Sequence, residues 1–538
     1  MTDRSPDGAK RNPGQVLQQS RRPPDFASPH PGYKANTDDG FLPLLARRVR
    51  DNPAGIFAQF ESVPLSFAEL DGAANALAFW MRDNGIEPGD RVALMIRNSP
   101  LALALLFAIA KVQAIWVPIN LQGRGENLGY IFNHAAPKLI IAETALMPTI
   151  GASGANLDGV QVFTTEAVQA VANARDGAPS WNEAPAADAT FAIMYTSGTT
   201  GRPKGVLVSH RMLRLSAEAV ALVSAARSGD VMFMWEPLYH IGGAQMIVLP
   251  LIRDVTLALV EHFSASRFWQ QVCVCGATHI HFLGGILQIL LKQPPSALDR
   301  QHGARIAWGG GCPREIWRPF EERFGMQIRE CYGMTECSSI TTFNDNGTVG
   351  AVGKPAPWFE VALIDAAGAP VAAGERGEIV VRTSLPGAIT RGYLQNPDAT
   401  ARALRDGAFH TGDLGSFDAD GNLYFHGRQT DNVRVRGENV SALEVEQVAA
   451  KHPAVEDCAM IGVAAEIGEQ DIKLFVKPRA GATLTAAELS GWLAERLAPY
   501  QNPRYIVMVD DFERTASQRI MKHKLAALTV ASFDRVMR

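Results

Sequence analysis

Hydrophobic and polar positions alternate along this chain with two periodicities, and together they predict an α/β protein. Residues 67–84 repeat apolar side chains at helical spacing, which predicts an amphipathic helix. Residues 91–96 form a short apolar run between turn residues, which is typical of a buried strand, whereas residues 101–110 are apolar throughout and indicate a buried helix. Because residues 115–119 and 138–142 continue this strand–helix–strand order, we expect a mainly parallel sheet covered on both faces.

The same rhythm recurs over residues 231–330, where Pro313 is expected to start a helix and Gly325 to end it. The pattern changes near residue 360. Short strands separated by turns, with the hairpin signal Asp420-Gly421 before the last of them, predict a β-rich unit over about residues 360–427.

A third pattern follows Arg428 and predicts a small α+β domain. Ser441-x-x-Glu444 and Thr485-x-x-Glu488 both have the form of a capping box, so each is expected to open a helix. Strands are expected between and after these helices. The predicted division is a disordered arm over residues 1–35, a large α/β domain over 36–427 that includes the β-rich unit, and a C-terminal domain over 428–538.

Composition excludes several classes of protein. A net charge of -4 over 538 residues leaves no basic surface for nucleic acid. The first 35 residues contain no apolar stretch of a secretory signal, and no apolar run approaches the ~20 residues that a membrane-spanning helix needs. The six cysteines are too few for a disulfide framework and read as reduced thiols. We expect a cytoplasmic enzyme without membrane insertion, and the oligomeric state stays open, a homo-oligomer included.

One loop carries the strongest chemical signal. An apolar strand-like run ends at Tyr195 and is followed by hydroxyl, glycine and lysine residues: Thr196, Ser197, Gly198, Thr199, Thr200, Gly201 and Lys204. Glycines let the backbone approach a phosphate, hydroxyl and N–H groups donate to its oxygens, and the lysine supplies a point charge. Arg202 and Pro203 stand where a Walker motif needs Lys followed by Ser or Thr, so the loop predicts nucleotide binding of another kind.

From about Phe41 to Leu525 the sequence resembles the AMP-forming acyl-CoA synthetase superfamily. The motifs that carry the resemblance are the loop at 195–205, Trp235 to His240, Gly309 to Gly311, Tyr332 to Glu336, Thr411 to Asp413 and Arg434 to Asn439. It implies a mobile C-terminal domain and an acid–thiol ligase that uses ATP, Mg²⁺ and coenzyme A.

The resemblance also implies roles for single residues. Those expected at adenosine and its phosphates are Gly309, Gly310, Gly311, Tyr332, Gly333, Thr335, Asp413 and Arg428, in addition to the loop. Mg²⁺ is expected on Thr196 and Glu336, the acyl group beside His240, and thioester formation beside Arg436 and Gly437. These roles agree with the chemistry, because joining a carboxylate to an α-phosphate brings two anions together and needs compensating positive charge. Taken alone, His240 reads more readily as a core histidine, and Asp413 reads equally as a turn residue. The motifs carry weight because they occur together and in order.

The end of the chain departs from the family. The usual pattern ends in Gly-Lys, and its lysine bridges the substrate carboxylate and the α-phosphate, but here Gln518 and Arg519 stand in those positions. Arginine keeps the charge but is planar and bulkier than lysine. Arg519 and Lys522 are therefore alternative candidates for this catalytic role, beside Thr196, Lys204, His240, Thr335 and Glu336.

Within the superfamily, residues 263–269 and 293–302 resemble crotonobetaine/carnitine–CoA ligases. A trimethylammonium substrate would need aromatic faces or an acid near the acyl group. Trp235, Glu236, Tyr239 and Trp308 are candidates, although Trp and Tyr are also ordinary core residues. Three functions remain: an acyl-CoA ligase for such an acid or another short or medium acid, an adenylation enzyme that loads a carrier protein, and a weakened homologue that only binds its ligand.

Overall fold

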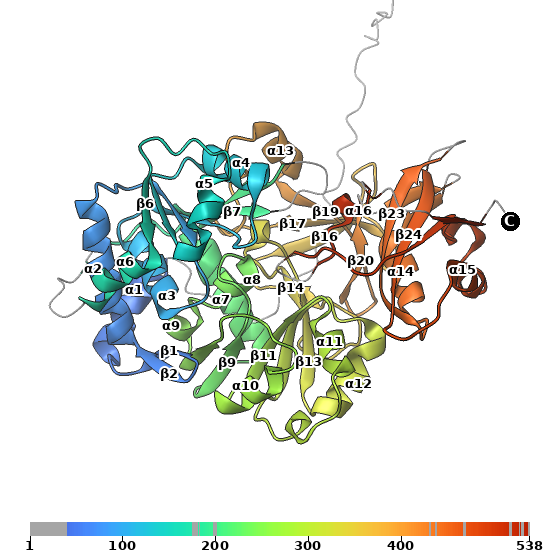
Figure 1. Ribbon diagram of the computed structural model, residues 1–538, viewed down its shortest axis with the longest axis horizontal. Helices are drawn as coiled ribbons and strands as arrows, with labels where there is room; N and C mark the ends of the chain where they lie inside the picture. The colour runs from blue at the N-terminus through green and yellow to red at the C-terminus, as the bar shows by residue number, and fades with distance from the viewer. Residues whose placement is uncertain are drawn as a thin grey trace, which may run out of the picture.

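The structure is a computed structural model that describes residues 40–174, 181, 183–196, 202–429, 432–435, 438–465, 470–515, 519–526, 528 and 532–535. The arm predicted over residues 1–35 lies outside these. Two large sheets are interleaved along the chain, because the strands of the nine-stranded sheet come from residues 56–66 and 230–355 and those of the six-stranded sheet from residues 91–209. A β-rich region and a smaller C-terminal α+β region follow them, as the colours of Figure 1 show. The predicted α/β class is confirmed.

The first large sheet has nine strands and holds the edge on which most of the site is built. Their order is β15 (Lys354–Pro355), β14 (Thr342–Phe343), β13 (Gln327–Tyr332), β12 (Ile306–Gly310), β11 (His279–Leu283), β9 (Asp230–Met234), β10 (Val255–Leu259), β1 (Ile56–Phe60) and β2 (Val63–Ser66). The strands from β13 to β1 pair in parallel, and the outer ones are antiparallel. Parallel strands end at the same edge of a sheet, which is where ligands bind in open α/β folds.

The second large sheet has six strands. Their order is β6 (Gln161–Thr164), β5 (Leu139–Ala142), β3 (Arg91–Met95), β4 (Ile115–Pro118), β7 (Thr190–Thr196) and β8 (Lys204–Ser209). Helices α3 (Pro100–Lys111) and α7 (His210–Ser224) are buried over almost their whole length, so side chains on all their faces are covered. The apolar run at 101–110 is thus a core helix, and Lys111 is neutralised there by Asp71 at 2.8 Å.

Other helices cover the sheets. They are α1 (Leu42–Asp51), α2 (Phe67–Asp83), α4 (Gly125–Ala135), α5 (Met147–Gly151), α6 (Thr165–Asn173), α8 (Ile241–Ala244), α9 (Leu249–Ile252), α10 (Phe268–Val274), α11 (Ile286–Lys292) and α12 (Arg314–Phe324). The predicted ends of α12 are confirmed, because Pro313 caps it and Gly325 closes it at a φ of 72°.

The remaining two regions lie toward the C-terminus. The β-rich region contains β16 (Glu360–Ile364), β17 (Gly377–Arg382), β18 (Leu404–Arg405), β19 (Ala408–Phe417), β20 (Leu423–Arg428) and α13 (Pro397–Ala403). The C-terminal region contains β21 (Asn432–Val435), β22 (Glu438–Ser441), β23 (Val455–Ala464), β24 (Gln470–Pro478), β25 (Tyr505–Met508), β26 (Phe533–Asp534), α14 (Ala442–Ala450), α15 (Ala486–Ala494) and α16 (Lys522–Leu525). Figure 1 places it against the end of the molecule formed by the β-rich region and α12.

The two predicted capping boxes have different outcomes. Thr485 and Glu488 form theirs, with each side chain bonded to the other's backbone N–H. Ser441 forms none, because its hydroxyl donates to the carbonyl of His426 at 3.1 Å instead. The helix α14 begins after Ser441 as predicted, but the predicted capping box is wrong, because a tertiary contact to β20 outcompetes the local hydrogen bond.

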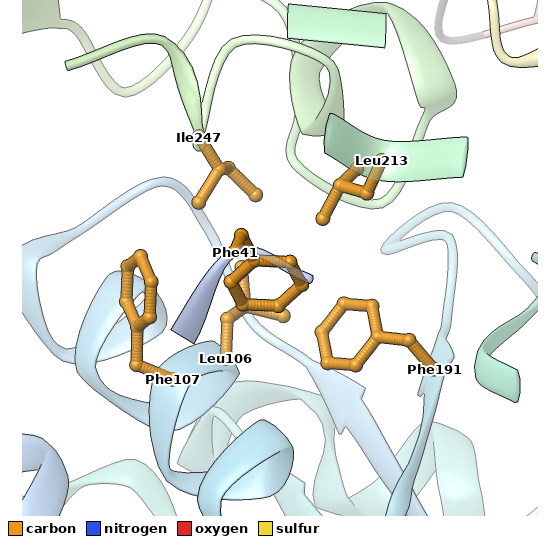
Figure 2. Close-up of a pocket in the computed structure, with 6 residues that line it drawn as sticks. All are labelled: Phe41, Leu106, Phe107, Phe191, Leu213 and Ile247. Carbon is orange, nitrogen blue, oxygen red and sulfur yellow. The ribbon is translucent and has the colours of Figure 1, made fainter. Parts of the chain in front are cut away.

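The core contains a narrow apolar gap that is not a ligand site. Figure 2 shows six side chains around it, and they are Phe41, Leu106, Phe107, Phe191, Leu213 and Ile247. The gap has no room for a water molecule and no polar lining. Among the described residues, no helix is long and apolar enough to cross a membrane.

Candidate active site

The ends of the predicted phosphate loop are held in a hairpin. Thr196 closes β7 and pairs with Lys204, which opens β8. Their pairing brings the two ends of the loop together, as a phosphate cradle requires. Ser197, Gly198, Thr199, Thr200 and Gly201 lie outside the described residues.

Glu336 lies beside the base of this hairpin. It belongs to a single 3₁₀ turn, η3 (Thr335–Cys337), which follows β13. The Tyr393 hydroxyl donates to Glu336 at 3.0 Å, and the ammonium group of Lys204 lies 5.0 Å from the centre of the Tyr393 ring. Burial raises the pKa of Glu336, and Tyr393, Arg428 and Lys204 offset this only in part.

A half-buried carboxylate with incomplete compensation suits a divalent cation. Mg²⁺ commonly takes one or two protein carboxylates and keeps waters and phosphate oxygens as its other ligands. Within the part of the chain that the structure describes, no cluster of three or more acidic, His or Cys ligands could hold a metal ion without such help. Glu336 therefore fits a Mg²⁺ ion that arrives with a nucleotide. Tyr393, which fixes this carboxylate, belongs to none of the sequence motifs.

A second group joins Tyr332 to the β-rich region. The Tyr332 hydroxyl donates to Asp413 on β19 at 2.7 Å, and its ring stacks on Phe425 at 5.6 Å. Arg428, opposite Asp413 on β20, lies 3.7 Å from the other carboxylate oxygen. Burial raises the pKa of Asp413, while Arg428 and Tyr332 lower it. The arrangement offers an aromatic ring and a carboxylate acceptor side by side, which suits a nucleoside.

The three glycines at the end of β12 have a structural reason of their own. A side chain on Gly309 would place its Cβ 1.8 Å from the Phe282 carbonyl of β11, and Gly311 has a φ of 93°. The N–H of Gly311 donates to Glu330 at 2.6 Å. A Cβ on Gly333, after β13, would likewise lie 1.8 Å from the Ser339 carbonyl, whereas one on Gly310 would lie 3.0 Å from the Cys331 carbonyl. The three glycines thus allow a tight turn beside the site, where the backbone is not covered by side chains.

The segment between β9 and α8 brings two titratable side chains to the same edge. His240 directly precedes α8, and its Nε2 atom is buried without a hydrogen-bond partner. Burial lowers the pKa of His240, Glu236 raises it, and Arg519 lowers it. Glu236 itself is buried, and Nδ1 of His281 lies 2.9 Å from its Oε2 atom.

The two alternatives at the end of the chain are placed differently. Arg519 is exposed to solvent, and the loss of water around its guanidinium and the charge of Arg428 lower its pKa, whereas Asp413 and Glu236 raise it. The charges of two carboxylates of the large domain thus act on this guanidinium. Lys522, on α16, instead forms an ion pair with Glu446 of α14 at 2.8 Å. The structure therefore brings Arg519 to the other site residues and does not bring Lys522 there.

These groups lie at the carboxyl edge of the nine-stranded sheet, where the hairpin, the β-rich region and the C-terminal region converge. Thr335 is buried in the η3 turn beside Glu336. Arg436 and Gly437 lie outside the described residues. Lys204 and Arg428 thus place positive charge near Glu336, a carboxylate suited to a metal ion. Next to them lie Tyr332 and Asp413, an aromatic ring and a carboxylate that suit a nucleoside. Such a set can stabilise negative charge that develops during phosphoryl or adenylyl transfer.

Comparisons with known proteins agree with this geometry. A family model described as AMP-binding enzyme matches residues 45–394, and one for the AMP-binding enzyme C-terminal domain matches residues 444–519. Crotonobetaine/carnitine–CoA ligase of Salmonella agona (strain SL483) is 32% identical over 511 residues, which cover 89% of this chain and 97% of that protein.

Two solved structures are similar over nearly the whole chain. ATP-bound MatB from Rhodopseudomonas palustris is 28% identical with a TM-score of 0.81, covering 90% of this chain and 97% of that one. The o-succinylbenzoate CoA synthetase MenE from Bacillus subtilis, in complex with the acyl-adenylate intermediate OSB-AMP, is 25% identical with a TM-score of 0.80, covering 91% and 99%.

Proposed function

This chain belongs to the AMP-binding enzyme family and is an acyl-CoA ligase that uses ATP, Mg²⁺ and coenzyme A, and we propose that the side chains described above carry out its two half-reactions. In the first, a carboxylate oxygen of the acid attacks the α-phosphorus of ATP, and pyrophosphate leaves. In the second, the thiol of coenzyme A loses its proton, its sulfur attacks the acyl carbonyl, and AMP leaves. The observation that carries this proposal is the convergence of Lys204, Glu336, Asp413 and Arg519 on one edge of the sheet.

Each role follows from the chemistry of the side chain. Lys204 and the hydroxyl and N–H groups of its loop bind phosphate oxygens, with Thr335 donating to the α-phosphate. Tyr332 packs against adenine beside Gly309–Gly311, while Asp413 and Arg428 bind the ribose hydroxyls. Glu336 and Thr196 would hold Mg²⁺, which supplies positive charge to the phosphate oxygens.

Arg519 takes the role that a lysine has in most of the family. Its fork of N–H donors can bind one oxygen of the substrate carboxylate and one of the α-phosphate at the same time. The electrostatic influence of Asp413 and Glu236 on its guanidinium supports this role. Lys522 is paired within the C-terminal region and is not part of the proposal.

The pose in which the two domains meet suits adenylation, because in it the charges of Asp413 and Glu236 in the large domain act on Arg519. We place the boundary at residue 428, as the sequence predicts. Charged contacts cross it at Lys451 and Glu315 at 3.0 Å, at Lys292 and the Glu456 carbonyl at 3.1 Å, and at Arg376 and Glu444. Exposed pairs of this kind contribute about 0–1 kcal/mol each, so they leave the domain free to move for the second half-reaction.

The substrate proposed here is an acid of the carnitine or crotonobetaine type. It rests on the name of the relative that is 32% identical and on the acid and aromatic residues near the acyl end of the site. A cytoplasmic location is also proposed, supported by six cysteines that are all free.

Pyrophosphate release over a panel of acids tests the proposal. Carnitine, crotonobetaine, straight-chain fatty acids and aryl acids would be compared, each with and without coenzyme A. We expect release of pyrophosphate with ATP and Mg²⁺, and acyl-CoA formation only when coenzyme A is present. Fatty or aryl acids that exceed carnitine and crotonobetaine by a large factor would refute the substrate, and acyl transfer to a carrier protein but not to coenzyme A would refute the second half-reaction.

A further inference from the structure

Two polar groups at the acyl end of the site are buried without a hydrogen-bond partner. Both carboxylate oxygens of Glu236 lack one although the residue is only 1% exposed, and Nε2 of His240 lacks one as well. Leaving a buried polar group without a partner costs about 1–3 kcal/mol, and more for a charged group. Native proteins therefore keep very few of them, and each calls for an explanation. A ligand that binds between these groups explains both.

The surroundings of Glu236 compensate its charge only in part. Nδ1 of His281 lies 2.9 Å from Oε2, but the pair does not have the geometry of a hydrogen bond, and Oε1 has no such contact. The His281 ring packs on Trp308 with centres 4.2 Å apart. At Gly242 a side chain would place its Cβ 2.3 Å from Oε2, so the glycine lets α8 begin directly against the carboxylate. A glycine at position 242 therefore leaves space for the carboxylate of Glu236.

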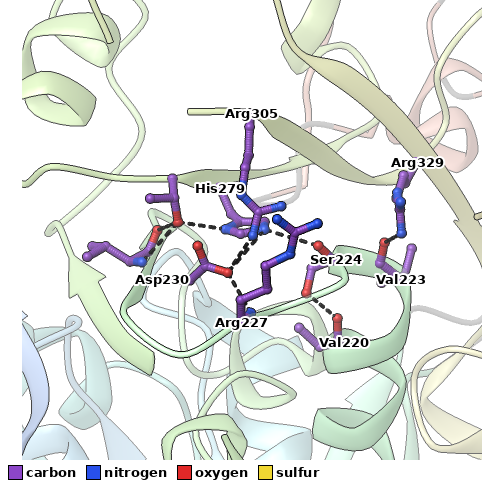
Figure 3. Close-up of polar contacts among 10 residues, drawn as sticks. Val220, Val223, Ser224, Arg227, Asp230, His279, Arg305 and Arg329 are labelled. Atoms are coloured by element: carbon purple, nitrogen blue, oxygen red, sulfur yellow. Dashed lines mark hydrogen bonds and ion pairs between the residues drawn. The ribbon is translucent and has the colours of Figure 1, made fainter. Parts of the chain in front are cut away.

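Strands β9 and β11 also hold a carboxylate, that of Asp230, whose hydrogen bonds are fully satisfied. At their amino ends, Asp230 of β9 accepts from the backbone N–H of Arg227 at 2.6 Å and from Arg305 at 2.5 Å. Figure 3 shows these bonds together with those of His279, which contacts the Ser224 carbonyl. The unsatisfied state of Glu236 is therefore particular to the site and is not a general property of buried acids in this fold.

We propose that Glu236 determines the substrate class of this ligase by binding a cationic nitrogen of the acyl group, so that the acids it activates are zwitterions. This inference rests on the proposed function, because it places the substrate carboxylate at Arg519 and the substrate cation at Glu236. The ligand then supplies the positive charge that Glu236 lacks. A primary ammonium donates a hydrogen bond to the free oxygen, and a trimethylammonium group packs its methyl groups against the carboxylate and the His281 and Trp308 rings.

A panel of matched acids tests the proposal on the unmodified enzyme. 4-(Trimethylammonio)butanoate is compared with 5,5-dimethylhexanoate, which has the same shape but carbon in place of the charged nitrogen, and 4-aminobutanoate is compared with pentanoate. We expect kcat/KM for pyrophosphate release to favour the cationic member of at least one pair by about 10- to 100-fold, the range of a hydrogen bond or ion contact to a charged group. The pair with the larger ratio identifies the kind of ammonium.

Two variants separate the carboxylate from its surroundings. Glu236→Gln keeps the size of the side chain and removes the charge, so the preference should fall to below about threefold. Glu261→Gln removes a carboxylate from the surface, where Glu261 pairs with Arg97 at 3.1 Å, and should keep the full preference. Melting temperatures of both variants show whether they are folded.

The outcomes are distinct. No preference in the unmodified enzyme, or an undiminished preference in a folded Glu236→Gln, would overturn the role of Glu236 while acids are still activated. Failure of every acid to release pyrophosphate would instead refute the proposed function itself. A ratio near one in the unmodified enzyme overturns the role of Glu236 even where Glu236→Gln does not fold.

Discussion

Two histidine–carboxylate pairs link β11 to β9 and the segment that follows it, and they are built in opposite ways. At the amino edge, Asp230 and His279 lie 3.9 Å apart inside a network in which each has other partners (Figure 3). At the carboxyl edge, His281 and Glu236 approach to 2.9 Å, but the carboxylate has no hydrogen bond.

The two pairs differ because only the carboxyl edge of the sheet carries the proposed active site. Residues two apart on a strand share a face, so His279 and His281 point the same way and differ only in which edge they approach. At the amino edge, an arginine and a backbone N–H satisfy the carboxylate of Asp230. At the carboxyl edge, which carries the proposed site, the carboxylate of Glu236 has no such donor among the described residues. We assign the complete pair to the framework and the incomplete pair to the site.

The largest effect is expected from a substitution that breaks the hydrogen-bond network at the amino edge of the sheet. Asp230→Ala leaves the Arg305 guanidinium and the Arg227 N–H without their acceptor and should destabilise the large domain by about 3–5 kcal/mol. Glu236→Gln is the matched change at the other edge and should alter stability by less than about 1 kcal/mol or raise it, because it removes an unsatisfied carboxylate. Thermal unfolding without ligands measures both. Equal losses in the two variants would contradict the contrast between the edges.

The next effect concerns the residue that reaches the carboxyl edge from the C-terminal domain. Arg519→Ala should slow acyl-adenylate formation about 100- to 1000-fold, the usual loss when a group that stabilises transition-state charge is removed. Thioester formation from supplied acyl-adenylate should stay within about threefold, and melting temperature should not change. Single-turnover assays of each half-reaction provide the test.

Lys522→Ala is the control for that experiment. It removes a cation from the same segment, but one that is paired with Glu446 and does not reach the site. Its adenylation rate should stay within about threefold of the parent enzyme, because an ion pair of this kind is worth about 1 kcal/mol or less. A larger loss in Lys522→Ala than in Arg519→Ala would assign the adenylation role to the lysine instead.

The amino edge should also make stability depend on pH. Burial lowers the pKa of His279 to about 4, Asp230 raises it and Arg305 lowers it. The unfolded chain, with a histidine pKa of about 6.5, then binds a proton that the folded protein does not, so stability should fall as pH decreases from about 6.5 to about 4. The loss should amount to at most about 3 kcal/mol. Melting temperatures across this range measure it.

His279→Gln separates this effect from other histidines. The amide can still bond to the Ser224 carbonyl but does not titrate, so the variant should lose less stability than the parent between pH 6.5 and 4. Identical pH profiles would show that His279 does not contribute. Glu236→Gln should leave the slope unchanged, since it acts at the other edge.

The smallest effect is expected where the two domains touch. Lys451→Glu places like charges opposite Glu315 and should weaken the adenylation pose by about 0.5–1 kcal/mol, which lowers the adenylation rate two- to fivefold. Adding Glu315→Lys restores an attractive pair and should restore the rate. The experiment is best done at low salt, because screening weakens exposed pairs. Failure of the double variant to recover would show that the contact does not hold this pose.

Much of the fold was accessible from the pattern of the chain alone. The periodicity of 67–84 appears as α2, and the run at 91–96 as β3, each within one or two residues. The glycine that ends α12 and the Thr485 box also formed as predicted. These features depend on interactions within a few residues, which a local pattern contains. Ser441 failed because its partner, His426, lies in another strand.

The candidate site also contains features that a local pattern predicts and features that depend on residues far apart in the sequence. The motifs with nucleotide chemistry, such as Tyr332–Glu336 and Thr411–Asp413, could be named because each is contiguous. Tyr393, which donates to Glu336 from 57 residues away, could not. Nor could the choice between Arg519 and Lys522, since both are cations near the end of the chain and only the tertiary structure pairs the lysine with Glu446 of α14.

By itself, the sequence determined the periodicities, the glycine turns and the order of the chemical motifs, because these are properties of neighbouring residues. Only the tertiary structure decided which charges are satisfied and which are left open. Asp230 and Glu236 are both acids next to β9, and nothing in their local sequence distinguishes them. Their difference arises from the arginine and the backbone N–H that reach one of them, and from the absence of such donors among the described residues around the other. Because a buried charge without hydrogen-bond partners is costly, this difference leaves Glu236 available for a ligand and makes Asp230 part of the framework.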